Sequence, residues 1–408
     1  MKNYLYERLR PEKKGSDSSV RHLNPLLLFI LIYIAYNGIG LIDTPWTIAG
    51  AYDKTLCWEL FLTGLAGASV ALVFWGGHRE YRIEPIIRRR TSRQLTALFF
   101  LMFTACLASA IFMTGGIPLF AGEERFGNSA LAFNLIQLYG FWALVRTISS
   151  METGRRVRYF HPILYMAGAL CFGYRTPILI FVFVIFVYLI TFKVSRGKGV
   201  VLGFCAILSI VIFSAVFAAY RVSQSYDFVI FFKNIDFRYI NDHKYLLPFV
   251  PALAMFDFSQ NTISTIGSAL HEHMYGQLLI SNYETFLPGK HWGARNIIGA
   301  ITSARWIAGR PMSITPTLQG ALYVDFGYVG VFFGFFLIVA IVGNLWRLTE
   351  KWSAVGKFSF CYLLTLSIMA IHNGYWDAGF VFFLFFLLII RIFDLLKTMS
   401  SRKVGGAG

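Results

Sequence analysis

The chain has 408 residues, of which 56% are hydrophobic, 17% aromatic and only 14% charged. Soluble domains have about 25% charged residues, so this composition excludes an ordinary water-soluble protein and indicates a polytopic membrane protein. The net charge of +16 is not accompanied by the aromatic-basic pattern of a nucleic-acid-binding module. We therefore expect no nucleic-acid partner.

The cysteines and the N-terminal stretch carry no sign of a metal site or of a cleaved leader. Five cysteines are scattered singly along mostly hydrophobic segments, without the spacing of a zinc site or a disulfide framework. We expect no disulfide, no metal and no cofactor. The basic segment 1–24 lacks a small-residue cleavage pattern, and we interpret it as a retained tail.

Hydrophobic segments recur along the chain from Pro25 onwards. A helix needs about 20 mostly apolar residues to cross the hydrocarbon core, and ten segments approach that length. The predicted spans are 25–42, 56–75, 95–114, 130–148, 159–174, 176–192, 199–219, 318–346, 358–376 and 378–396. The predicted fold class is therefore an all-α polytopic membrane protein.

The basic residues test this count, because short cytoplasmic loops carry an excess of Lys and Arg. With the N-terminus inside, 26 of the 37 Lys and Arg residues fall on the cytoplasmic side. This places the tails 1–24 and 397–408 in the cytoplasm. The spans then form two groups, at 25–219 and 318–396, separated by a long extracytoplasmic loop at 220–317.

The long loop contains two segments of interest. Residues 246–256 are apolar but too short and too proline-broken to span, so we expect a re-entrant or interfacial segment. The residues after it, 257–279, have a helical period and a polar start at Asp257 or Ser259. We therefore expect an ordered loop with short helices.

Arginine outnumbers lysine on the predicted outer side, which has seven Arg residues and four Lys residues. Arg is the preferred planar, bidentate partner of phosphate. Arg125 follows the glycine- and proline-containing turn TGGIPLFAGEERFG, Arg175 lies between two apolar segments, and Arg221 follows a span. Each of these arginines can bind a phosphate group, or it can be a solvated or snorkelling side chain. The residues alone leave both interpretations open.

The stretch GRPMSITPTLQGALYVDFGYVG, residues 309–330, leads from the long loop into the eighth span. Its prolines favour an extended entry, and Thr315 or Thr317 can cap the helix. With Arg310 nearby, the start of this helix has the features of an anion site. Asp325, inside an apolar span, needs a partner such as an Arg or a Tyr hydroxyl, in a structural or a catalytic role.

The outer loop also carries titratable groups that can serve as a general base. His271, Glu272 and His291 are our candidates for taking a proton from a sugar hydroxyl. They lack the spacing of a metal site, and a solvated loop position is the alternative interpretation.

At this point the sequence resembles the oligosaccharide repeat-unit polymerases, the Wzy-type O-antigen polymerase family. The resemblance rests on GGIP followed by Arg125, on the G-x-R-T turn ending at Thr176, on the long outer loop and on ITPTLQGALYVDFGYVG before a span. An R-x10-G pattern described for some members is absent, since Arg310 and Gly320 are one residue closer.

The resemblance implies a GT-C-like fold and a reaction at the outer face of the cytoplasmic membrane. The substrate would be an oligosaccharide linked to undecaprenyl diphosphate, polymerised without a metal, with membrane lipid and a chain-length regulator protein as further partners. The arginines that match the diphosphate-binding positions are Arg125, Arg175, Arg221 and Arg310. An O-antigen ligase and a polytopic transporter are the alternatives, although no internal repeat supports transport.

Overall fold

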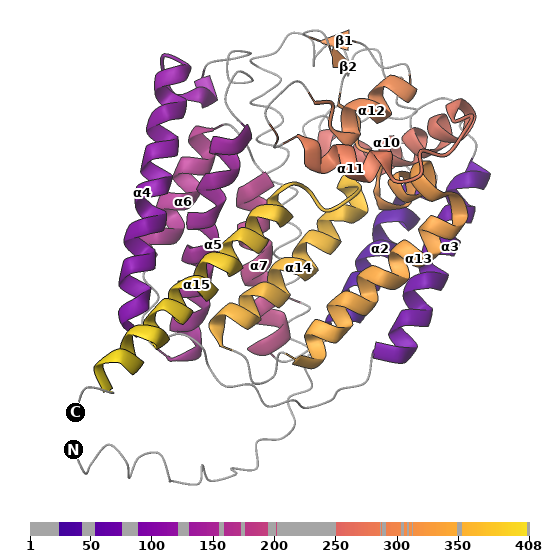
Figure 1. Ribbon diagram of the computed structural model, residues 1–408. Helices are drawn as coiled ribbons and strands as arrows, with labels where there is room; N and C mark the ends of the chain where they lie inside the picture. The colour runs from indigo at the N-terminus through magenta and orange to yellow at the C-terminus, as the bar shows by residue number, and fades with distance from the viewer. Residues whose placement is uncertain are drawn as a thin grey trace.

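The computed structural model describes residues 24–42, 54–75, 89–120, 130–154, 159–172, 176–194, 201, 250–285, 287, 291–302, 306–307, 310–311, 313–348 and 353–405. These ranges are almost entirely helical, with one pair of two-residue strands (Figure 1). The predicted all-α class is confirmed for this part of the chain.

The first group of helices precedes the long loop. It comprises α2 (Pro25–Leu41), α3 (Lys54–Trp75), α4 (Arg89–Met113), the short 3-10 helix η1 (Pro118–Phe120), α5 (Ala130–Glu152), α6 (Phe160–Cys171) and α7 (Thr176–Phe192). The second group is α13 (Leu318–Leu348), α14 (Ala354–Asn373) and α15 (Gly379–Gly405). Between them lie α10 (Val250–Ala269), α11 (Gln277–Glu284), α12 (Ala294–Ile301), β1 (Trp306–Ile307) and β2 (Arg310–Pro311).

Nine of these helices coincide with predicted spans. In the described ranges, six are long and apolar enough to cross a membrane, namely α3, α4, α5, α13, α14 and α15. The apolar helices α2, α6 and α7 have 17, 12 and 17 residues. Helices form here because a backbone surrounded by lipid must satisfy its hydrogen bonds within its own segment. The predicted span 199–219 lies outside the described residues apart from Val201, so the count of ten stays a prediction.

One end of the helix bundle is covered by α10, α11, α12 and the two strands, which we call the cap (residues 250–311; Figure 1). A Cβ on Gly40, at the end of α2, would lie 2.7 Å from the carbonyl oxygen of Phe256 in α10. A Cβ on Gly267 of α10 would lie 2.2 Å from the Leu56 side chain, at the start of α3. The end of α2 and the start of α3 therefore both meet the cap.

The contacts at the other end show how α5, α7 and α14 run through the bundle. Glu152, at the end of α5, accepts a hydrogen bond from Lys357 Nζ at 2.5 Å and pairs with Lys193 at 3.2 Å. Since Lys357 lies in the first turn of α14 and Lys193 follows α7, these three helix ends meet opposite the cap. The end of α14 is at the cap, where His372 Nδ1 lies 2.6 Å from the Tyr36 hydroxyl of α2.

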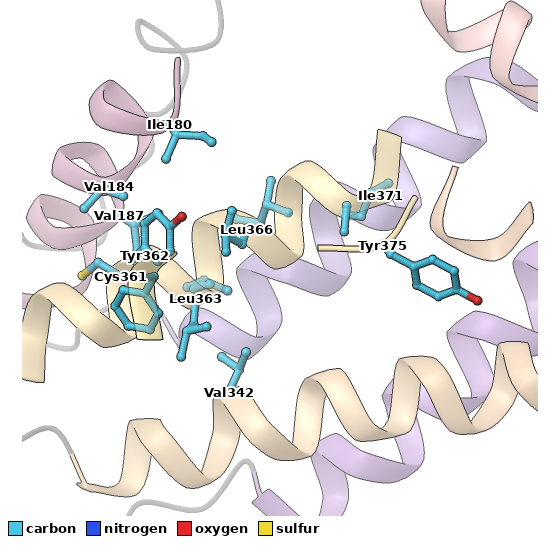
Figure 2. Close-up of a cluster of buried hydrophobic side chains, with 14 of the residues drawn as sticks. Ile180, Val184, Val187, Val342, Cys361, Tyr362, Leu363, Leu366, Ile371 and Tyr375 are labelled. Atoms are coloured by element: carbon cyan, nitrogen blue, oxygen red, sulfur yellow. The ribbon is translucent and has the colours of Figure 1, made fainter. Parts of the chain in front are cut away.

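Helix α14 is the centre of the bundle. It contacts α2, α5, α7 and α13, and Figure 2 shows the apolar side chains of α7 and α13 that flank it, including Val184, Val187 and Val342. Thirteen of its residues are buried, from Phe358 to Ile371. The hydrophobic surface of α14 therefore faces protein rather than lipid.

The closest helix packing joins α3 to α13. A Cβ on Gly67 would lie 2.2 Å from the carbonyl oxygen of Phe332, and one on Gly64 would lie 3.0 Å from the Phe335 ring. Small residues let helix backbones approach in this way inside membranes. The contact holds the main part of α13 against the first helices of the chain.

A buried polar network anchors the cap to the bundle. Asn37 Oδ1 of α2 accepts hydrogen bonds from Gln319 Nε2 at 2.9 Å and from Gln260 Nε2 at 3.1 Å. Tyr33 donates from its hydroxyl to Gln319 Oε1 at 2.6 Å. The network joins α2, α10 and α13, and it fixes the height at which α10 lies on the bundle.

The long loop differs in detail from the sequence-based expectation. Helix α10 is one continuous element from Val250 to Ala269, with Pro251 in its first turn where a missing N–H is tolerated. It therefore joins the expected interfacial segment to the expected helix. The helical period predicted through 257–279 is interrupted at residues 270–276, where the amides of Met274 and Tyr275 donate to carbonyls of α13 instead.

Candidate functional site

Helix α13 is sharply bent inside the DFG stretch. Gly327 has φ 64° and ψ −156°, a conformation that is essentially restricted to glycine. The first part of the helix folds back on the second, so that a Cβ on Gly334 would lie 2.5 Å from the Leu322 side chain. Gly330 and Gly334 thus allow close packing within the bent helix.

The loop between α10 and α11 completes the backbone hydrogen bonding at the bend. Met274 N donates to Val324 O and Tyr275 N donates to Asp325 O, each at 2.9 Å. A straight helix would satisfy these carbonyls from within. Tyr275, at φ 50°, and Gly276, at φ 91°, allow the chain to turn into α11 immediately afterwards.

Asp325 lies at the centre of this arrangement and is fully buried. Its carboxylate accepts from the amides of Leu278 and Leu279, at 3.0 and 2.9 Å, and from the Tyr375 hydroxyl at 2.6 Å. The two amides belong to the first turn of α11, so Asp325 caps that helix and compensates its positive end. Of the partners expected for Asp325, the structure provides the Tyr hydroxyl, and the three donors give the residue a structural role.

The candidate bases lie on the cap in different settings. His271 and Glu272 are exposed in the loop that crosses the bend. His291 Nδ1 lies 4.0 Å from Glu284 Oε2, at the end of α11. An exposed position suits a base that must reach a substrate hydroxyl, but no hydrogen bond or ion pair in the described part of the chain joins His291 to the other two.

His273, between these residues, has a different place. Its Nε2 would lie 2.9 Å from a Cβ on Gly327, and its ring meets that of Tyr323 edge to face at 5.5 Å. The imidazole therefore covers the bend of α13, and Gly327 is required for its close approach as well as for the backbone turn.

Only one of the four diphosphate-binding candidates lies among the described residues. Arg310 is in β2, where its backbone pairs with Ile307 of β1, at the edge of the cap. Arg125, Arg175 and Arg221 lie outside the described residues. Their grouping with Arg310 therefore stays a prediction.

The start of α13 has the predicted cap residue but is enclosed. Thr317 Oγ1 accepts from the Gly320 amide at 3.2 Å, which confirms one of the two expected caps. Thr317 and Gln319 are each only 1% exposed, and Pro316 packs against Gly374. An anion that approaches from Arg310 thus meets a covered helix start.

A charge pair at the connection between α14 and α15 is the clearest charged feature that the sequence did not single out. Asp377 interacts with Arg295 of α12, and both side chains are partly buried. Burial raises the pKa of Asp377 above its usual value, and Arg295 and the Gly379 amide oppose this. Burial lowers the pKa of Arg295, which Asp377 offsets. Each charge therefore offsets part of the free-energy cost of burying the other.

The residues around this pair tie the cap to the α14–α15 connection. Burial and the Asp377 charge raise the pKa of Tyr283, in α11, to about 12. Asn282 Nδ2 donates to the Trp376 carbonyl at 2.7 Å. The signal available in the sequence was an acidic residue in a very short connection between two apolar spans, a position that is costly unless the charge is paired.

The described residues contain no group of three or more His, Cys, Asp and Glu side chains that could hold a metal ion. No curated protein and no solved structure matches the chain. A sequence model of the O-antigen polymerase family matches residues 22–386, from the start of the first span into α15 and across the bend of α13. The chain therefore belongs to the O-antigen polymerase family.

Proposed function

We propose that this protein polymerises oligosaccharide repeat units, carried on undecaprenyl diphosphate, into O-antigen or a related surface polysaccharide. The observation that carries the proposal is the family match over residues 22–386. The family indicates a glycosyltransferase-like polymerising enzyme. The lipid-diphosphate donor and the absence of a metal requirement are part of our proposal.

We place the cap at the outer face of the cytoplasmic membrane and both termini in the cytoplasm. The distribution of Lys and Arg supports this orientation. So does the position of Lys193 and Lys357, which meet at the end of the bundle opposite the cap. A lipid-linked glycan presented at the outer face would then meet the cap residues. A GT-C-like arrangement of ten spans is part of the same proposal.

In the proposed mechanism, arginines stabilise the leaving diphosphate. Glycosyl transfer breaks the C1–O bond of the donor while negative charge grows on the leaving oxygen, so fixed cations lower the barrier selectively. One Arg–phosphate pair at about 4 Å is worth roughly 4 kcal/mol at an effective dielectric of 20, before desolvation. Arg125, Arg175, Arg221 and Arg310 are our candidates for this role.

Replacing Arg310 by Ala should leave surface glycans capped by a single repeat unit, as in a strain that lacks the gene. The measurement is glycan length on a gel, with lipid-linked intermediates extracted in parallel from a deletion strain complemented by each variant. Arg93→Ala is the matched control, since Arg93 is an exposed arginine at the start of α4, and it should give normal polymer.

The same experiment separates the alternatives. Normal polymer from Arg310→Ala, at wild-type protein levels, would refute the role of that arginine. Long polymer that accumulates on the lipid carrier in the deletion strain would identify a ligase. Unchanged surface glycans in that strain would favour a transporter.

The acceptor hydroxyl is a poor nucleophile and needs a general base. Loss of a general base lowers rates by about 100- to 10,000-fold, so we expect one of His271→Ala, Glu272→Gln and His291→Ala to do so. Initial polymerisation rates with purified lipid-linked repeat units measure this. Three variants with rates within about twofold of wild type would contradict the assignment of the base to this group.

A further inference from the structure

Glu59 is an isolated carboxylate in a mostly apolar helix. It is the one charged residue in the predicted span 56–75, and it is exposed on the surface of α3. A charged residue in a membrane helix is costly unless it is paired, and such residues usually have a function. The structure therefore has to be searched for a group that offsets this charge.

The neighbours of Glu59 leave its charge uncompensated. The Tyr328 hydroxyl of α13 donates to Glu59 Oε2 at 2.5 Å. Lys54, the nearest cation in the sequence, instead directs its Nζ to the Leu41 carbonyl of α2 at 3.4 Å, and no Lys, Arg or His in the described ranges forms an ion pair with Glu59. Because a carboxylate can accept about four hydrogen bonds, most of this capacity is available to a bound group.

Glu59 lies at the level where the bundle meets the cap. Two residues before it, Cys57 Sγ donates to the Gln260 carbonyl of α10 at 3.3 Å. Helices α3 and α13 then run side by side at one edge of the bundle, as far as the hydrogen bond from Trp75 Nε1 to Asn344 Oδ1 at 2.8 Å (Figure 1). The carboxylate is thus at the cap end of two membrane helices, where lipid headgroups lie.

Two aromatic rings stand beside the carboxylate, and the bend of α13 brings them together. Tyr323 and Tyr328 lie on either side of Gly327, and their ring centroids are 5.4 Å apart. In a straight helix, residues five positions apart would point about 140° away from each other. Tyr328 is 41% exposed. Since ring faces attract cations, rings beside a carboxylate favour a positively charged ligand over a phosphate.

Beyond the carboxylate, the exposed surface of α13 is apolar. Its exposed side chains recur every four residues and therefore lie on one side of the helix. At 1.5 Å per residue this row is about 18 Å long, while half of a hydrocarbon core measures about 15 Å. The row is thus long enough to pack along an acyl chain in one leaflet. Its members are Val329, Phe333, Leu337 and Ile341.

We propose that Glu59, Tyr328 and this apolar row bind a phospholipid with a primary ammonium headgroup, such as phosphatidylethanolamine. The ammonium group donates to the Glu59 carboxylate and lies against the Tyr328 ring, and an acyl chain follows the row on α13. The site goes beyond the proposed polymerase function and does not depend on it.

The experiment measures phospholipid binding to the purified full-length protein by native mass spectrometry. The two probes are phosphatidylethanolamine and phosphatidylcholine with identical acyl chains, so that they differ only in the headgroup. The quaternary ammonium of phosphatidylcholine has the same charge but no N–H to donate. We expect wild type to bind phosphatidylethanolamine about tenfold more tightly, the effect of one charge-assisted hydrogen bond.

Glu59→Gln should abolish this preference. Its amide oxygen can still accept from the Tyr328 hydroxyl, so the contact between α3 and α13 is retained while the charge is lost. Glu284→Gln is the matched control, because Glu284 is a 44% exposed carboxylate on the cap, at the end of α11. The same chemical change there should leave the tenfold preference intact.

Stability provides a readout that separates lipid binding from a structural role. A ligand that binds only the folded protein raises the thermal unfolding midpoint. Replacing phosphatidylcholine by phosphatidylethanolamine in nanodiscs should therefore raise the midpoint of wild type and of Glu284→Gln, and leave that of Glu59→Gln unchanged. In phosphatidylcholine alone, Glu59→Gln should unfold at the wild-type temperature.

Three results would overturn the lipid site. Equal affinity of wild type for the two lipids would do so without any variant. A preference that persists in Glu59→Gln would place the binding elsewhere, and an equal loss in Glu284→Gln would reduce it to a general effect of surface charge. Glycan length in the deletion strain tests the proposed function separately, so that either proposal can fail alone.

Discussion

Asp325→Ala should be among the most destabilising single substitutions in this protein, lowering the free energy of unfolding by about 3 kcal/mol or more. The change removes the acceptor of three hydrogen bonds at a fully buried position. It leaves two amides of α11 without their partner, and each such orphan costs about 1–3 kcal/mol. The Tyr375 hydroxyl keeps only the Ala321 carbonyl, at 3.2 Å, as an acceptor. Thermal unfolding of the purified protein in detergent measures the loss.

Tyr375→Phe should cause a smaller loss of stability than Asp325→Ala and is the comparison for this prediction. It removes a single donor to the same carboxylate, which still accepts from the Leu278 and Leu279 amides. A hydrogen bond to a charged group contributes about 1.5–3 kcal/mol, so this variant should lie between wild type and Asp325→Ala. An Asp325→Ala protein as stable as Tyr375→Phe would show that the cap on α11 contributes little.

Gly67→Ala should separate α3 from α13 and also strongly lower stability. Its Cβ would lie 2.2 Å from the Phe332 carbonyl oxygen, and a backbone atom cannot move aside as the end of a side chain can. Overpacking typically costs about 1–3 kcal/mol, occasionally more. The value here should be at the upper end, because the two helix backbones are in direct contact. Thermal unfolding and the yield of folded protein are the measurements.

Gly38→Ala is the matched control, with the opposite sign expected. A Cβ at Gly38 has no atom within 4 Å, and Gly38 lies inside α2. Ala is favoured over Gly in a helix by about 0.5–1 kcal/mol, so this variant should be slightly stabilised. Equal effects of the two substitutions would mean that helix propensity, rather than the α3–α13 contact, decides the result at Gly67.

The spans were predictable because their length is set by an external constraint. A bilayer of fixed thickness requires a fixed number of apolar residues, and the predicted span 176–192 is reproduced by α7, Thr176–Phe192. The bend of α13 was not predictable, because glycine is also common inside straight membrane helices. Only the docking of residues 274 and 275 shows which glycine turns the chain.

The same distinction holds for the site. Thr317 was predictable as a cap because a capping residue acts on amides two or three positions away. The partners of Asp325, by contrast, lie 46 to 50 residues away in sequence. Arg295 of α12 and Asp377 of the α14–α15 connection likewise meet only through the fold. Single-sequence patterns carry local hydrogen bonding and burial, and they contain little about which distant polar groups will pair.

Met274 and Tyr275 complete the hydrogen bonding at the bend of α13. This limits where a reporter can be inserted to map the membrane topology. The loop 270–276, in which His271, Glu272 and Tyr275 are exposed, would seem a natural insertion site, but an insertion there separates the two amides from the Val324 and Asp325 carbonyls. Such a fusion would report the collapse of the cap rather than its sidedness. The turn at Gly154, with φ 63° and no neighbouring atom within 4 Å of a Cβ, has no comparable long-range role and is the better position for a reporter at the opposite end.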